Sequence, residues 1–151
     1  MSKKPEGFHS VTPHFVVEGA RQAIDLYKAA LGAEEMMAMP LPGTDLIMHA
    51  AIKVGDSMMF LSDPYDGGDR TPPAKGTVSA TAFYHYVDDV DAVFKQAIDA
   101  GMTAIADPED MFWGDRTAVV TDGFGYNWTL ATFVREVSEE EMAEAMKQMA
   151  G

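Results

Sequence analysis

Apolar side chains at the start of the chain follow first a strand-like and then a helix-like pattern. Residues 11–17 form a short apolar run of the length of a strand. Residues 20–31 place their apolar side chains on one face of a helix, and Gly32 follows where such a helix would end. This stretch therefore predicts a strand followed by a helix whose inward face is Ala23, Ile24, Tyr27, Ala30 and Leu31.

The next pattern predicts strands without a further helix. Residues 46–54 are extended and mostly apolar, and the dipeptide Gly55-Asp56 is typical of a hairpin turn. Residues 57–62 are then expected to form the second strand of this hairpin. Residues 63–76 contain paired glycines and paired prolines, which is the composition of a linker. We therefore expect the first module to end here.

The second half of the chain repeats this order. Residues 78–87 predict a strand, residues 90–100 an amphipathic helix, and Gly101 its end. A hairpin is then predicted, because residues 117–121 and 128–134 are strand-like and flank a turn rich in glycine.

Because two independent stretches agree, the sequence predicts an internal duplication. The fold class is α+β, with paired βαβββ modules at about 8–66 and 77–136 that form a curved mixed sheet around a cleft. Together they make a single domain over residues 8–136, followed by a helix over residues 137–151.

The terminal segment carries signals of a capped helix. Ser138 and Glu141 have the spacing of a capping box. Met142, Met146 and Met149 recur at helical spacing, which predicts a buried stripe. The domain or a second subunit must cover this stripe, so a homodimer is expected.

Composition and charge exclude several classes of protein. The 151 residues include no cysteine, which excludes disulfides and thiolate metal sites. The formal net charge of −13 opposes nucleic acid or an anionic membrane as a partner. No window has the roughly 20 apolar residues of a membrane span and no secretory leader is evident, so a cytoplasmic location is expected.

Several motifs resemble those of the vicinal-oxygen-chelate superfamily, the relatives of glyoxalase, bleomycin-resistance proteins and extradiol dioxygenases. They are the Ala-Ile-Asp-Leu-Tyr run of residues 23–27, the Asp-Gly-Phe-Gly turn of residues 122–125, and the Met-Phe-Trp-Gly-Asp-Arg run of residues 111–116. The last is similar to the PhnB-like branch. The resemblance implies the paired-module fold, but this fold serves lyases, isomerases, thiol transferases and proteins that only bind a drug.

The resemblance also identifies four positions at which metal-using relatives carry histidines and carboxylates. Here they are held by Thr12, Ala82, Phe60 and Thr129, none of which is a competent ligand. The PhnB-like pattern would also place histidines at Tyr126 and Phe133, which are aromatic residues here. We therefore expect no metal and no other cofactor, although a divalent metal bound by shifted histidines is the alternative.

The residues that remain suggest a cleft for a small molecule. Trp113, Tyr126 and Trp128 could stack on a flat ligand while Arg116 grips a carboxylate or phosphate. Alternatively, Asp115 and Arg116 only stabilise the turn and have no role in binding. The expected ligand-binding residues are His14, His49, Phe60, Trp113, Arg116, Tyr126 and Trp128.

Three hypotheses for the function follow. The first is a small-molecule-binding protein with a metal-free cleft for an aromatic or carboxylate-bearing molecule. The second is a metal-dependent lyase, isomerase or thiol transferase that uses His14, His49 or His85. The third is an interaction module, in which the cleft is vestigial and the terminal helix is the functional element. Asp115 or His14 could act as a general base, but the catalytic residues stay unknown.

Overall fold

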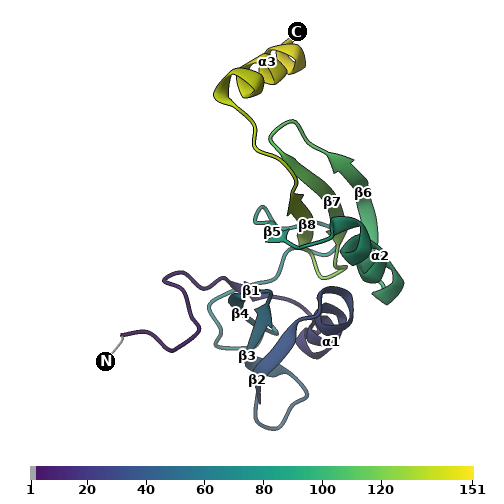
Figure 1. The fold of residues 1–151 in the computed structure, drawn as a ribbon. Helices are drawn as coiled ribbons and strands as arrows, with labels where there is room; N and C mark the ends of the chain where they lie inside the picture. The colour runs from purple at the N-terminus through teal and green to yellow at the C-terminus, as the bar shows by residue number, and fades with distance from the viewer. Residues whose placement is uncertain (1–2) are drawn as a thin grey trace.

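The computed structural model describes residues 3–151 and shows two similar halves followed by a separate helix (Figure 1). Each half has one helix and a four-stranded sheet, ordered β1-β4-β3-β2 in the first and β5-β8-β7-β6 in the second. The elements of the first half are β1 (His14–Val16), α1 (Ala20–Leu31), β2 (Glu34–Pro40), β3 (Ile47–Val54) and β4 (Ser57–Ser62). Those of the second half are β5 (Phe83–Tyr86), α2 (Val90–Ala100), β6 (Thr103–Asp110), β7 (Asp115–Thr121) and β8 (Asn127–Phe133), and α3 (Glu139–Ala150) follows.

Both halves have the strand pairing of a βαβββ unit, and the α+β fold class is confirmed. In each sheet the first strand pairs in parallel with the fourth, and the other pairs are antiparallel. The predicted helices and the hairpin of β7 and β8 are confirmed. Among residues 3–151, no helix is long and apolar enough to cross a membrane.

The first strand of each half is shorter than predicted. In the first half, Pro13 lacks an N–H and can only accept, from the Phe60 N–H at 2.8 Å. In the second half, the Ser79 hydroxyl accepts the N–H of Thr81 at 3.0 Å and turns the chain locally. Residues 11–13 and 78–82 therefore stay outside the sheets.

A buried carboxylate from outside the helix caps α1. Asp63 directly follows β4, and its Oδ1 accepts the N–H groups of Gly19 at 2.8 Å and Ala20 at 3.0 Å. Its other oxygen accepts the N–H of Ile47 at 2.8 Å. One side chain thus satisfies free donors of the helix and fixes the start of β3. The sequence assigned Asp63 only to a linker.

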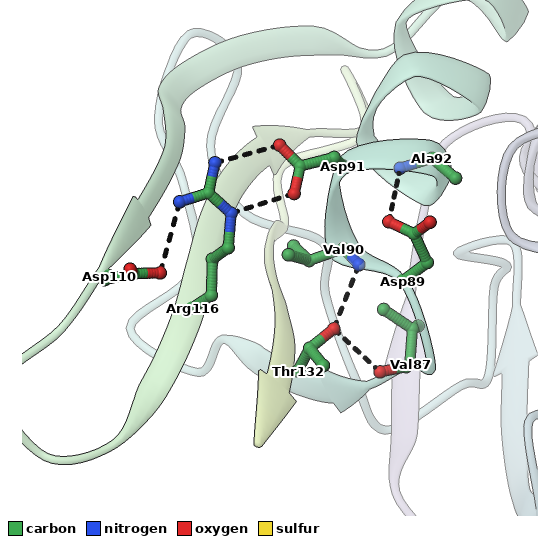
Figure 2. Close-up of polar contacts among 8 residues, drawn as sticks. All are labelled: Val87, Asp89, Val90, Asp91, Ala92, Asp110, Arg116 and Thr132. Atoms are coloured by element: carbon green, nitrogen blue, oxygen red, sulfur yellow. Dashed lines mark hydrogen bonds and ion pairs between the residues drawn. The ribbon is translucent and has the colours of Figure 1, made fainter. Parts of the chain in front are cut away.

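Thr132 has the corresponding position in the second half (Figure 2). Its hydroxyl accepts the N–H of Val90, the first residue of α2, and donates to the carbonyl of Val87, both at 2.9 Å. Asp89 adds a local cap by accepting the N–H of Ala92 at 3.1 Å. Both helices are therefore attached to the last strand of their own sheet.

A buried network joins the two halves. Asp122 lies in the turn before β8, and its Oδ2 accepts the hydroxyl of Tyr27 on α1 at 2.6 Å and the indole N–H of Trp128 at 3.1 Å. Its Oδ1 accepts the backbone N–H groups of Phe124 at 2.7 Å and Tyr126 at 3.1 Å. Four donors from both halves therefore converge on one carboxylate.

Two further contacts cross the same boundary. The hydroxyl of Tyr126 donates to the carbonyl of Val16 in β1 at 3.0 Å. The two helices lie side by side (Figure 1), and the Gln96 amide of α2 donates to the carbonyl of Ala29 at 3.1 Å. The halves thus pack through their helices and their central aromatic residues.

The terminal helix does not pack on the domain. The Ser138 hydroxyl caps it by accepting the N–H of Glu141 at 3.1 Å and donates to the Glu141 carboxylate at 3.4 Å, so Ser138 is the N-cap as predicted. However, α3 buries no residue and extends away from both sheets (Figure 1). Met146 and Met149 are exposed, so the prediction of a stripe buried by the domain is wrong. The stripe has no partner surface within residues 3–151.

Candidate functional site

Each sheet has one side that faces its helix and one open side. Because side chains alternate along a strand, the register decides which residues share the open side. In the first sheet, His14 of β1 is paired with Phe60 of β4, which is paired with Ala51 of β3. His49 lies two residues before Ala51 and so faces the same way. The register therefore places His14 beside His49 and Phe60.

The three rings are in contact. The centroids of His14 and His49 are 5.7 Å apart, those of His49 and Phe60 4.7 Å, and those of His14 and Phe60 6.1 Å. Phe8 from the N-terminal segment packs on Phe60 at 5.6 Å. The structure thus brings together three of the seven expected site residues.

Beside these rings lies a cavity of about 160 Å³. Its lining includes both histidines and, from the segment after β4, Asp63, Tyr65, Asp69 and Arg70. Arg70 pairs with the exposed Asp69 at 2.6 Å. The segment that reads as a linker therefore forms one wall of the cavity.

Charged groups near the cavity shift the titration of His14. Burial lowers the pKa of His14, and the nearby charges of Arg70 and His49 lower it further, whereas Asp69 raises it. The cavity therefore combines one arginine and two histidines with the carboxylates of Asp63 and Asp69.

The residues at the superfamily's four metal-binding positions do not fit a divalent ion. Phe60, which is paired with His14, has no atom that can bind a metal. Its counterpart in the second half is Thr129, which is paired with Tyr84 and offers only a hydroxyl. No group of three or more histidine, aspartate or glutamate side chains that could hold a metal occurs in residues 3–151. His14 and His49 supply two nitrogen atoms, fewer than the three or four donors a metal needs.

His85 does not join the two histidines. It belongs to β5, and its side chain points to the opposite side of the sheet from those of Tyr84 and Tyr86. It lines a different cavity, beside the β3–β4 turn. A Cβ atom added at Gly55 would lie 3.3 Å from its ring. His85 therefore does not line the cavity of His14 and His49.

Arg116 faces the helix and is already paired (Figure 2). Its guanidinium donates to both carboxylate oxygens of Asp91 on α2, at 2.8 and 3.0 Å, and to Asp110 at 3.2 Å. These pairs raise the pKa of Arg116. Arg116 was expected to bind a ligand carboxylate or phosphate. Instead its guanidinium is paired with aspartates on the helix side of the sheet, opposite the open side. It also does not pair with Asp115, which points to the other side of the sheet.

Tyr126 and Trp128 belong to the core. Tyr126 is 6% exposed and Trp128 1% exposed. Trp128 packs against Tyr27 at 5.3 Å and Phe83 at 4.7 Å between centroids. The two rings therefore form no exposed surface, although Tyr126 lines a second cavity with His14 and Arg70, and Trp128 lines the cavity of His85. Their role in ligand binding stays a prediction.

Trp113 takes part in a cluster on the open side of the second sheet. Its indole N–H and the hydroxyls of Tyr84 and Tyr86 all donate to Oδ2 of Asp115, at 3.2, 2.6 and 2.9 Å. The sequence reasoning missed both tyrosines. The signal was their alternation around His85, which places them on one face of a strand.

Comparison with known proteins assigns the family. The model of the family described as Glyoxalase/Bleomycin resistance protein/Dioxygenase superfamily matches residues 7–130. The chain belongs to this superfamily. An uncharacterized protein of Mycobacterium bovis is 40% identical over 141 residues, which cover 91% of both chains.

Solved structures of the superfamily show the same fold. TioX from Micromonospora sp. ML1 has a TM-score of 0.67 and 22% identity, with 83% of this chain and 99% of TioX covered. The PhnB protein from Bacillus cereus, described as a putative 3-demethylubiquinone-9 3-methyltransferase, has a TM-score of 0.63 and 15% identity. That match covers 82% of this chain and 99% of PhnB. The expected PhnB-like, glyoxalase-related fold is confirmed, and at these identities the likeness concerns the fold.

Proposed function

We propose that this superfamily member binds a small aromatic or carboxylate-bearing molecule on the open side of its first sheet, without a metal. The observation that carries this proposal is the contact of His14, His49 and Phe60 beside a cavity that Arg70 also lines. Stackable rings and basic groups occur together there, as recognition of an aromatic acid requires.

The donor atoms support binding rather than metal-dependent catalysis. Two imidazoles are too few for a stable divalent site, and the remaining superfamily positions supply no carboxylate. Ser62 and both histidines line the same cavity, but within residues 3–151 neither His14 nor His49 is hydrogen-bonded to a hydroxyl that could act as a nucleophile. We therefore favour reversible binding over the lyase, isomerase or transferase alternative.

Nuclear magnetic resonance titration with small aromatic acids, benzoate first, tests the proposal. We expect shifts of the imidazole signals of His14 and His49, and a loss of about tenfold in affinity for Arg70→Gln, as for one charge-assisted contact. His85→Gln is the matched control, because it changes a histidine outside the cavity. Shifts confined to residues away from the first sheet would contradict the proposal.

The affinity for benzoate should depend on pH. The pKa of His14 is lowered from 6.5, so the imidazole is neutral at pH 7 and takes up a proton only below pH 6.5. The protonated ring attracts an anion, so benzoate affinity should rise as the pH falls below 6.5. Calorimetric titrations across this range should show the rise in the wild type and a flatter profile in His14→Gln.

A matched variant separates this effect from other titrating groups. Burial also lowers the pKa of His85, but His85 lines a different cavity. His85→Gln should therefore keep the pH profile of the wild type. An identical profile in His14→Gln would show that another group controls anion binding.

We also propose that the chain forms a homodimer through α3. An isolated helix of about 12 residues is marginal in water. The 12-residue α3 buries none of its residues, although it carries Met142, Met146 and Met149 at helical spacing. A second copy of the chain would cover this stripe and stabilise the helix. The interaction-module hypothesis thus becomes a proposal about self-association.

Met146→Glu should convert the dimer to a monomer, because the substitution places a charge in the centre of the stripe. Light scattering after size-exclusion chromatography measures the mass. Gln148→Glu is the matched control, since it adds the same charge on another face of α3. A wild-type monomer, or equal dissociation in both variants, would contradict the role of the stripe.

A further inference from the structure

The open side of the second sheet is covered by two tyrosine side chains that reach across a strand. Tyr84 and Tyr86 belong to β5, whereas Asp115 belongs to β7, and β8 lies between these strands. Both hydroxyls nevertheless donate to Oδ2 of Asp115, at 2.6 and 2.9 Å. The two side chains must therefore extend along the sheet surface.

Burial on this face agrees with that arrangement. Ala131 of β8 is paired with Tyr86 on one side and with Thr117 of β7 on the other, so all three side chains point to the open side. Ala131 is 0% exposed and Thr117 3%, whereas Tyr86 is 59% exposed. Small residues thus lie below the phenol rings, and the rings present their outer surface to solvent.

Trp113 completes this surface. Its indole N–H donates to Asp115 at 3.2 Å and approaches the hydroxyl of Tyr84 at 3.3 Å. The rings of Tyr84 and Tyr86 are 5.3 Å apart, and Phe112 packs edge-on against Trp113 at 5.0 Å. We call Tyr84, Tyr86, Trp113 and Asp115 the aromatic platform.

Within the described residues, the carboxylate of Asp115 at the centre of the platform has no cationic partner. Asp115 is 3% exposed, and no lysine or arginine of residues 3–151 forms an ion pair with it. Arg116, the next residue, points to the helix side and binds Asp91. The faces of aromatic rings are also electronegative, so rings and carboxylate together attract positive charge.

The two phenols keep their protons in this arrangement. Burial and the hydrogen bond to Asp115 raise the pKa of Tyr84 to about 12, and the hydrogen bond to Asp115 also raises the pKa of Tyr86. Both hydroxyls therefore stay donors to the carboxylate near neutral pH, which keeps the rings in place.

We propose that the aromatic platform binds an organic cation, of the quaternary ammonium class, over the faces of Tyr84, Tyr86 and Trp113 with Asp115 as the counter-charge. Attraction of such a cation to aromatic faces needs no hydrogen-bond donor on the ligand. The site lies on the second sheet and is distinct from the anion-binding cavity of His14. It therefore does not depend on the proposed function of the first sheet.

Choline and its uncharged isostere 3,3-dimethylbutan-1-ol are the probes, because they differ mainly in charge. Titration monitored by the indole N–H signal of Trp113 should show binding of choline, with the isostere weaker by about tenfold. Tyr86→Leu should lower the affinity for choline by a similar factor, and this exposed position should leave the fold intact. Arg116→Gln, on the other side of the sheet, is the control and should bind choline as the wild type does.

Asp115→Asn tests the counter-charge, with a denaturation curve recorded beside each titration. A folded Asp115→Asn protein should bind choline about tenfold more weakly. Equal binding of choline and its isostere would overturn the proposal in favour of a merely apolar surface. Absence of choline binding, together with dissociation of a dimer by Tyr86→Glu, would also overturn it and assign the platform to contact between two copies of the chain.

Discussion

Asp122→Ala should lower the free energy of unfolding by about 4 kcal/mol, because it leaves several buried donors without an acceptor. The carboxylate accepts from the Tyr27 hydroxyl, the Trp128 indole and two backbone N–H groups, and it is 3% exposed. Burial and the neighbouring carboxylate raise the pKa of Tyr27, so the phenol stays a donor that needs this acceptor. Because Tyr27 belongs to the first half, the substitution should also loosen the contact between halves.

Urea denaturation followed by circular dichroism measures this loss. Asp56→Ala is the matched control, since Asp56 is exposed in the β3–β4 turn and its removal should change stability by less than about 0.5 kcal/mol. Tyr27→Phe should cost less than Asp122→Ala, because it removes one donor and keeps the acceptor. If Asp122→Ala were as stable as Asp56→Ala, the network would not be what joins the halves.

Trp128→Ala should destabilise the protein by about 4 kcal/mol, because it opens a large cavity in the core. The side chain is 1% exposed and packs between Tyr27 of α1 and Phe83 of β5. Its indole also donates to Asp122 at 3.1 Å. The effect should appear in stability, whereas benzoate affinity of the folded fraction should stay unchanged.

Trp113→Ala provides the matched comparison with the same substitution. Trp113 is 38% exposed, so its removal should cost only about 1 kcal/mol. Denaturation curves of both variants, with benzoate titrations at low denaturant, separate a core role from a binding role. A stable Trp128→Ala protein with weakened benzoate binding would restore Trp128 to the ligand site.

Local signals explain which parts of the fold could be predicted. The helices and the β7–β8 hairpin are bounded by glycines and an Asp-Gly turn, which mark ends within a few residues. By contrast, no strand was delimited at Glu34–Pro40 or Thr103–Asp110. Both strands are mostly exposed and lack an alternating apolar pattern, so pairing with β3 and β7 alone defines them.

The candidate site could be predicted only where strand alternation was sufficient. Alternation gave the direction of His14, and the register brings it to His49 and Phe60. Asp63 and Arg70 could not be found, because their roles depend on how an irregular segment folds back on the first sheet. Position in the hairpin likewise could not show that Trp128 is buried, since that depends on packing between halves.

The same limit explains the reassignment of Arg116. Its neighbours in sequence suggested a loop or a ligand contact, but its partners are on α2 and β6. The register of β7 sends adjacent side chains to opposite sides of the sheet, so Asp115 and Arg116 act separately. A motif read along the chain cannot show this division without the strand boundaries.

The most direct test of the central claim is calorimetric titration of benzoate into protein stripped of metal with a chelator, beside the same protein supplied with Zn²⁺, Ni²⁺, Co²⁺ or Mn²⁺. We predict equal benzoate affinity in all samples and a loss of binding in His14→Ala, because the rings and basic groups of the first sheet form the site. Stoichiometric metal binding that His14→Ala abolishes, with benzoate bound only to the metal-loaded protein, would contradict the account.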